Sequence, residues 1–222
     1  MFDELPELYV LILSGYFRHT VVATYYTILT LITKLLPTGS KSRKLKMVVN
    51  VRVRSVVMIV GVFSDVHDNL DNLRKALEIF KANQAECLIF CGDFCSPIPA
   101  RVMGEAFAGD IHVVFGNGDG DRFAISNVAN TTYPNLNLHG EHAELDLAGN
   151  KVAVTHYPFY AQALARTGDY QAVFSGHTHQ LHEERIGDCL WLNPGEVLGW
   201  QGQATCALYD TVTNTATIVS LA

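Results

Sequence analysis

The sequence predicts an α/β fold with two sheets packed face to face and helices outside them. Three observations on the 222-residue chain support this prediction. In the first part of residues 58–222, short apolar runs alternate with amphipathic segments, which is typical of parallel strands and crossover helices. Short alternating strands with turn residues follow. No linker rich in Pro, Gly or Ser separates the two parts, so we expect one domain.

The α/β part begins with a buried strand over residues 58–64. A helix is predicted over 69–83, where apolar residues recur at helical spacing with charged residues on the other side. A second strand over 87–91, a helix over 99–107 and a third strand over 111–115 continue the alternation. This order implies parallel strands joined by right-handed crossovers.

Turn residues organise the β-rich part. Gly149-Asn150 lies within an alternating segment and suits a hairpin. Further hairpins are expected around Gly187-Asp188 and Thr213-Asn214, and a short helix is expected over residues 158–166.

Charge is unevenly distributed along the chain. Residues 1–57 hold 8 of the 16 Lys and Arg, which leaves 8 basic against 19 acidic residues, a net charge of −11, for residues 58–222. Binding nucleic acid through its phosphates requires clustered Lys and Arg, so no dedicated nucleic-acid surface is expected.

The five cysteines form no C-x-x-C pair. We interpret Cys87 and Cys91 as buried apolar residues, which is typical of a protein in the reducing cytoplasm.

Residues 1–57 leave three interpretations open. Residues 8–36 are apolar apart from a few basic side chains, so they could contact or cross a membrane. Alternatively, the segment is a mis-called start, with Met47 or Met58 as the true one, or it is a helical hairpin integral to the domain. The acidic beginning of the chain argues against a secretory signal peptide, so we expect a cytoplasmic protein, membrane-associated if the segment is authentic.

Polar clusters follow the ends of five predicted strands. Open α/β sheets bind ligands at the carboxyl ends of their strands. The clusters are Asp65-Val66-His67, Gly92-Asp93, Gly116-Asn117-Gly118-Asp119, His156 and Gly176-His177-Thr178-His179. Imidazoles and carboxylates together bind Mn, Fe or Zn, and one carboxylate can bridge two metals about 3.5–4 Å apart. The set therefore predicts a site for a pair of divalent cations.

This ordered set resembles the calcineurin-like metallophosphoesterase superfamily, and its spacing is most similar to the small prokaryotic YfcE-type phosphodiesterase branch. The resemblance covers residues 58–222 and implies a four-layer α/β/β/α sandwich. It also implies which residues hold the two metals: Asp65, His67 and His179 one, Asn117, His156 and His177 the other, with Asp93 bridging.

The activity implied by the resemblance is two-metal-dependent hydrolysis of a phosphate ester, a phosphodiester above all, by in-line attack of a metal-bridging hydroxide. Mn is the preferred cation, with Ni, Fe, Zn and Mg as alternatives. Asp93, Asn117 and His156 are the expected catalytic residues, and Asn117 is also expected to bind substrate. Asn69 is a further candidate for substrate binding, although we expect Asp68 or Asn69 to cap the following helix.

One position departs from the superfamily pattern. Many of its phosphatases have His where this chain has Gly118, and that His protonates the leaving group or binds phosphate. Loss of a general acid typically costs about 10²–10⁴-fold in rate, which favours small phosphodiesters or activated esters over alkyl monoesters. Asp119 is expected to hold the loop by hydrogen bonds. Residues 193–196 resemble the superfamily's N-P-G-S segment with Glu196 in place of Ser, and either form a turn or contribute to the site wall.

Two other functions stay open. A catalytically weak protein of the same fold could act as a scaffold through protein contacts, although the intact histidines argue against it. A related nuclease activity is disfavoured by the acidic domain, but a small cyclic nucleotide or dinucleotide substrate is compatible with it. The remaining histidines considered are interpreted as ordinary surface or core residues: His112, His139, His142 and His182.

Overall fold

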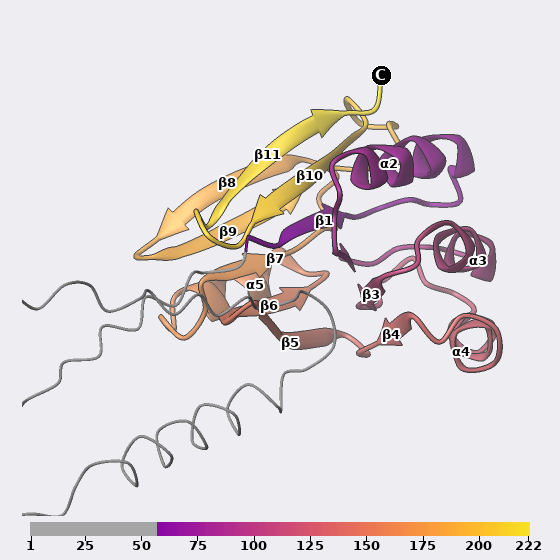
Figure 1. Cartoon of the computed structure of the whole chain (residues 1–222), viewed down its shortest axis with the longest axis horizontal. Helices are drawn as coiled ribbons and strands as arrows, with labels where there is room; N and C mark the ends of the chain where they lie inside the picture. The colour runs from indigo at the N-terminus through magenta and orange to yellow at the C-terminus, as the bar shows by residue number, and fades with distance from the viewer. Residues whose placement is uncertain (1–56) are drawn as a thin grey trace, which may run out of the picture. The chain divides into compact units, whose positions relative to one another are not determined.

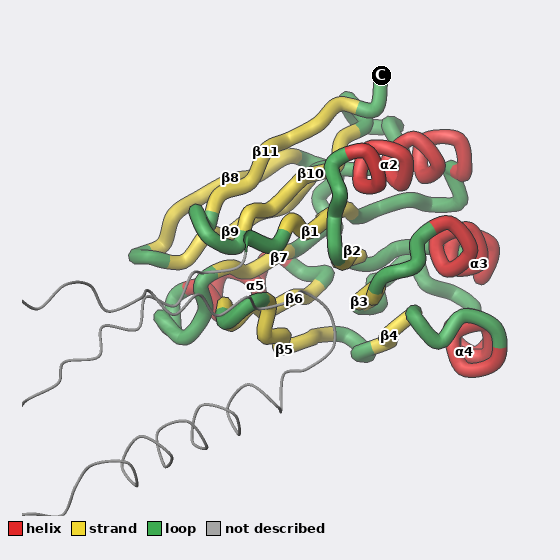
Figure 2. Tube along the Cα trace, in the orientation of Figure 1, coloured by secondary structure: helices red, strands yellow, loops and turns green. Residues whose placement is uncertain are grey.

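The computed structural model describes residues 57–222, which form four layers in the order helices, sheet, sheet, helix (Figures 1 and 2). The predicted α/β/β/α sandwich is confirmed. The expectations for the N-terminal extension, including a membrane segment over 8–36, concern residues outside this range. None of the helices in the described range is long and apolar enough to cross a membrane.

The first sheet has the strand order β11-β10-β1-β2-β3-β4. Its strands are β1 (Ile59–Phe63), β2 (Cys87–Phe90), β3 (Asp110–Val113), β4 (Leu136–Leu138), β10 (Thr205–Asp210) and β11 (Thr215–Ser220). The first four run parallel, which confirms the predicted parallel strands, and β10 pairs antiparallel with β1. The C-terminal hairpin therefore joins the sheet beside the first strand of the described range, a pairing that no local pattern indicates.

Three helices cover the outer face of this sheet (Figure 1). They are α2 (Leu70–Ala82), α3 (Pro97–Ala106) and α4 (Arg122–Thr131). Asn69 caps α2, because its Oδ1 accepts the Asn72 N–H at 3.2 Å, which confirms one of the two expected caps. Helix α4 was not predicted, since its Ser, Asn and Thr residues have low helix propensity. Asp121 stabilises its start by accepting the Ala124 N–H at 2.9 Å.

The second sheet has the order β5-β6-β7-β9-β8. Its strands are β5 (His142–Leu147), β6 (Asn150–Thr155), β7 (Ala172–Phe174), β8 (Leu181–Ile186) and β9 (Cys189–Pro194), and α5 (Pro158–Ala165) packs on its outer face. The β5–β6 turn is Ala148-Gly149, with φ of 54° and 94°, one residue earlier than the predicted Gly149-Asn150. The other two predicted hairpins and the helix over 158–166 are confirmed.

An apolar layer between the two sheets fixes their relative position. Val62 and Ile89 from the first sheet pack in one cluster with Val154 and Leu192 from the second. Cys87 and Cys91 are buried in the same cluster, as expected from the sequence. Packing the sheets face to face brings the ends of strands from both sheets together at one edge, where the polar clusters lie.

Candidate metal centre

The loops that follow five strands bring all seven predicted ligands into one connected cluster. Contacts of 2.7–3.8 Å link Asp65, His67, Asp93, Asn117, His156, His177 and His179. Within it, two groups of three place their ligand atoms within 4.8 Å of one another. These groups are Asp65 with His67 and His179, and Asp65 with Asp93 and His156.

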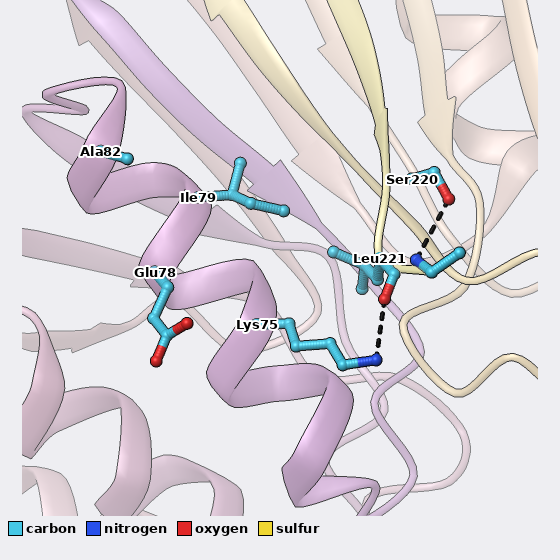
Figure 3. Close-up of a pocket in the computed structure, with 7 residues that line it drawn as sticks. Lys75, Glu78, Ile79, Ala82, Ser220 and Leu221 are labelled. Atoms are coloured by element: carbon cyan, nitrogen blue, oxygen red, sulfur yellow. Dashed lines mark hydrogen bonds between the residues drawn. The ribbon is translucent and has the colours of Figure 1, made fainter.

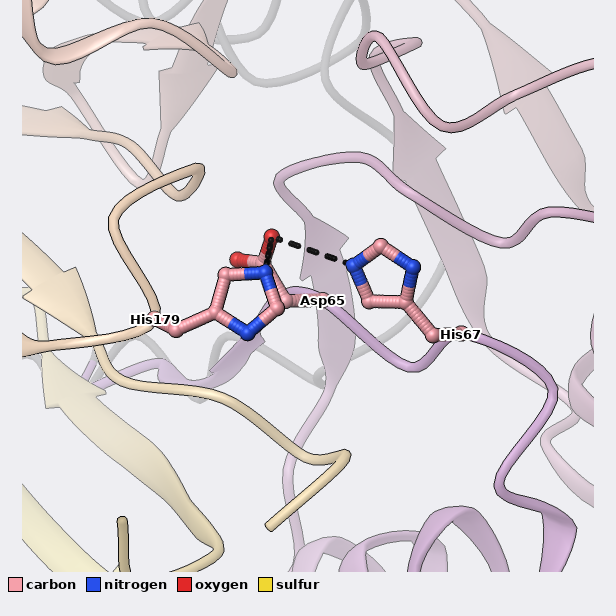
Figure 4. Close-up of side chains that lie close together, drawn as sticks. All are labelled: Asp65, His67 and His179. Carbon is pink, nitrogen blue, oxygen red and sulfur yellow. Dashed lines mark ion pairs between the residues drawn. The ribbon is translucent and has the colours of Figure 1, made fainter. Parts of the chain in front are cut away.

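Asp65 lies between two imidazole rings (Figure 4). Its Oδ1 is 3.8 Å from Nε2 of His67 and 3.4 Å from Nε2 of His179. Its Oδ2 accepts the backbone N–H of His177 at 3.1 Å. Within the described residues, Asp65 Oδ1 and His67 Nε2 are buried without a hydrogen-bond partner. Buried polar atoms are normally paired, so this arrangement fits a cation between them.

Asp93 contacts both parts of the cluster. Its Oδ2 is 3.4 Å from Nε2 of His67 and 3.4 Å from Nε2 of His156. Its Oδ1 accepts the Gly118 N–H at 2.6 Å, which fixes the orientation of the carboxylate. Its Oδ2 thus contacts one histidine from each of the two predicted ligand sets, His67 and His156.

Asn117 completes the other end of the cluster. Its Oδ1 is 3.1 Å from Nε2 of His156 and 2.7 Å from Nδ1 of His177. An amide oxygen is a hard ligand that adds no charge, which suits a site already holding two carboxylates.

Acceptors outside the cluster determine which histidine nitrogens face it. Nδ1 of His156 is 2.8 Å from the Cys91 carbonyl, and Nδ1 of His179 is 2.7 Å from Oε2 of Glu196. Carbonyl and carboxylate oxygens only accept, so both Nδ1 atoms donate. Each Nε2 is then left with a lone pair directed at an aspartate oxygen. Two facing acceptors require either a proton or a cation between them.

The contacts between histidines and aspartates in the cluster shift the pKa values of three of its residues. The interaction with Asp65 raises the pKa of His67, against the lowering effect of burial. Burial acts to lower the pKa of His156, but the bond to Asp93 outweighs it and the pKa is raised. Burial acts to raise the pKa of Asp93, yet His156 keeps that pKa below its ordinary value. Without a cation, the carboxylates therefore favour the protonated forms of His67 and His156.

The backbone of the cluster is strained. Five of the candidate residues have φ between 42° and 74°: Asp65, His67, Asp93, His177 and His179. Residues other than Gly rarely adopt this region, and such strain concentrates at functional sites. Gly116 provides space, since a Cβ there would overlap the Asp93 carboxylate and lie 2.8 Å from the His156 ring.

Asp119 holds two loops together beneath the cluster. Its Oδ1 accepts the N–H of Phe94 at 2.7 Å and of Cys95 at 3.2 Å, and its Oδ2 accepts the N–H of Asp93 at 3.1 Å and of Gly116 at 2.8 Å. The expectation that Asp119 holds the loop by hydrogen bonds is confirmed.

Asn69 lies outside the connected cluster. Besides capping α2, it donates from Nδ2 to the Leu198 carbonyl at 2.8 Å. It thus ties the segment after Glu196 to the start of α2, and its role in binding substrate stays a prediction.

Sequence reasoning missed two residues that contact the candidate ligands, Cys95 and Tyr157, and left Glu196 open between a turn and the site wall. Glu196 is fully buried against His179, which supports the site-wall alternative. Cys95 places Sγ 3.1 Å from Nδ1 of His67, and the ring of Tyr157 packs against His177 at 5.4 Å between centroids. Only Tyr157 had a local signal, since it directly follows His156. The other two reach the site through loop conformation.

A surface hollow lies away from this chemistry. It has a volume of about 310 Å³ and is formed by α2 and the chain end, where Lys75 Nζ donates to the Leu221 carbonyl at 2.9 Å (Figure 3). None of the seven candidate ligands lines it.

His112 and His139, interpreted as ordinary residues, have ring nitrogens 3.0 Å apart. Neither belongs to a group of three ligand residues found in the range 57–222.

A four-layer sandwich with imidazoles and carboxylates gathered at its strand ends defines the class of metal-dependent phosphate-ester hydrolases. The family model for the calcineurin-like phosphoesterase superfamily domain matches residues 58–214. The chain belongs to the calcineurin-like phosphoesterase superfamily.

Known relatives agree with this assignment. Phosphodiesterase MJ0936 of Methanocaldococcus jannaschii is 32% identical over 157 residues, which cover 69% of this chain and 93% of that protein. A solved structure of a novel archaeal phosphodiesterase is similar with a TM-score of 0.68 at 30% identity, covering 73% of this chain and 99% of that chain. YfcE, a phosphoesterase from E. coli, shares the fold with a TM-score of 0.51 at 20% identity, covering 74% of this chain and 100% of that chain.

Proposed function

We propose that the chain is a phosphodiesterase that holds two divalent cations in this cluster and hydrolyses a small or activated phosphodiester. The observation that carries the proposal is the position of Asp93, whose Oδ2 contacts Nε2 of His67 and of His156 at 3.4 Å each. Asp65, His67 and His179 would hold one cation, and Asn117, His156 and His177 the other, with Asp93 between them.

Divalent cations at such a site activate water and neutralise the negative charge that develops on the phosphate. The chain's own residues prepare the site for them. The Cys91 carbonyl and Glu196 bind Nδ1 of His156 and of His179, which directs each Nε2 towards the cluster. Asp119 fixes the loops that carry Asp93 and Asn117, so the ligands are oriented before substrate arrives.

The substrate class follows from residue 118. Gly118 offers only its backbone N–H, which is donated to Asp93, so no side chain at this position can protonate a leaving group. Esters with good leaving groups need such help least. Phosphodiesterase MJ0936 and the archaeal protein of the solved structure, at 32% and 30% identity, are both named phosphodiesterases, which supports a diester over a monoester.

We further propose Mn as the cation, with Ni, Fe, Zn and Mg as competitors. The donors are imidazole nitrogens, carboxylate oxygens and one amide oxygen, while the Cys95 thiol contacts the other ring nitrogen, Nδ1, of His67. This mixed set suits Mn, Fe, Ni or Zn better than an all-oxygen site would.

The test is hydrolysis by the full chain of bis-p-nitrophenyl phosphate and of p-nitrophenyl phosphate, with each of the five metals. We expect metal-dependent cleavage that is faster for the diester and strongest with Mn. Asp93→Asn should abolish it, whereas Asp71→Asn, at a 95% exposed side chain on α2, should not. A folded protein that turns over neither ester with any metal would favour the scaffold.

Residues 58–222 are proposed to contain all of the catalytic domain, since the family match begins at residue 58. The same assay on residues 58–222 tests this boundary. Equal kcat and KM for the two chains would support it, and a loss of activity in a folded shorter chain would refute it.

A further inference from the structure

A continuous row of aromatic rings leads from the metal centre to solvent. The ring of Tyr157 packs edge-on against His156 and His177, with centroids 5.2 and 5.4 Å away. Tyr160 follows at 6.0 Å from Tyr157, and Phe159 lies 5.6 Å from Tyr160. We call Tyr157, Tyr160 and Phe159 the aromatic row.

The two outer rings of this row are exposed, and the packing of α5 does not require them. Phe159 is 79% and Tyr160 57% exposed, whereas α5 packs on its sheet through the small buried side chains Ala161 and Ala165. The helix would therefore pack equally well without these two rings. Adjacent exposed aromatic side chains next to a reactive cluster are typical of a surface that binds a ligand.

The charge near the row indicates what kind of group it binds. Arg122, at the start of α4, is already engaged by Glu141 at 3.2 Å and by the Gly116 carbonyl at 2.9 Å. The described range has a net charge of −11. A net negative charge of this size disfavours binding of a second phosphate, while aromatic faces bind planar uncharged rings by stacking.

We infer that the aromatic row binds a planar aromatic or heteroaromatic group on the phosphodiester, namely the group that the phosphate keeps after cleavage. This inference rests on the proposed function, because it assigns a specificity surface to the same site. Tyr157 would lie nearest the phosphate, and Tyr160 and Phe159 would contact the ring farther out.

The test compares two substrates that release the same leaving group. Phenyl p-nitrophenyl phosphate and ethyl p-nitrophenyl phosphate both yield p-nitrophenolate, and they differ only in the group retained. The full chain with Mn should show a lower KM for the phenyl ester. Replacing both exposed rings, Phe159→Ala with Tyr160→Ala, should reduce that KM preference about tenfold, because the stacking contact with the retained ring is lost.

Two controls separate stacking from other effects. Tyr160→Phe keeps the ring and should keep the preference. Phe123→Ala removes another exposed aromatic ring, 86% exposed at the start of α4, and should also leave the preference unchanged. Unchanged far-UV circular dichroism verifies that the variants fold.

The outcomes distinguish this inference from the proposed function. Hydrolysis of both esters with the same KM, or an equal rise of KM for both in the double variant, overturns the aromatic row while the phosphodiesterase stands. An unaltered preference together with a changed oligomeric state in the double variant overturns it in favour of a protein contact. Hydrolysis of neither ester by the parent chain refutes the proposed function itself.

Discussion

The fully buried carboxylate of Glu196 lies 2.7 Å from Nδ1 of His179, on the side of the ring opposite the metal centre. Its other oxygen accepts the backbone N–H of Gln201 at 2.5 Å and of Gly202 at 2.9 Å. The carboxylate is thus fixed by its own loop and in turn fixes the histidine. Such an outer carboxylate sets the tautomer of a ligand histidine and makes the inner nitrogen a better donor.

Replacing Glu196→Gln should therefore weaken metal binding without unfolding the protein. We expect the affinity for Mn to fall about 10–100-fold, the usual cost of losing an outer partner of a metal ligand. Isothermal titration calorimetry on the metal-free protein measures this directly. Glu183→Gln, at an exposed position of β8, is the matched control. Equal affinities for both variants and the parent would show that Glu196 only stabilises its loop.

Gly116→Ala should disrupt the cluster because of its Cβ alone. The added methyl group would overlap the Asp93 carboxylate and approach the His156 ring to 2.8 Å. We expect a loss of metal binding and of phosphodiester cleavage by a factor of about 100 or more, since displacement of about 1 Å at a reacting site can cost that much. Gly120→Ala, in the same loop with no atom within 4 Å of the new Cβ, should behave as the parent.

Asp119→Asn should lower the free energy of unfolding. The substitution places an amide nitrogen where a carboxylate oxygen accepts two backbone N–H groups, so at least one buried donor loses its partner. The expected cost is about 1–3 kcal/mol. Urea denaturation of the metal-free protein measures it, with the exposed Asp169→Asn as control. Equal midpoints for the two variants would contradict the role of Asp119 in holding the loops.

Metal binding should release protons and strengthen as the pH rises. The pKa values of His67 and His156 are raised above the ordinary 6.5 in the metal-free protein, by Asp65 and Asp93 respectively, against the effect of burial. A cation must displace these protons, so the apparent affinity increases from pH 6 towards pH 8 and levels off once both imidazoles are neutral. Calorimetry in buffers of different ionisation enthalpy counts the protons released. Binding at pH 6.5 with no proton release would refute the protonated state of both histidines.

The sequence by itself determined the α/β order and the order of the candidate ligands. The secondary structure of apolar strands such as 58–64 and 87–91 can be predicted from the local sequence pattern. The residues directly after a parallel strand must then lie at the carboxyl edge of the sheet. For this reason Asp65, Asp93 and Asn117 could be identified without a structure. Helix α4 was not predicted, because its polar residues give no strong helical pattern.

Only the tertiary structure decided what lies behind and beside those ligands. Glu196 and Cys95 reach His179 and His67 through loops whose left-handed residues, such as Cys95 with φ of 73°, have no periodic signature. The pairing of β10 with β1, and the contact of Tyr157 with His177, also join parts distant in sequence. Periodicity reports only which face of an element is buried. Which side chain meets which across two sheets depends on packing the whole chain into one core.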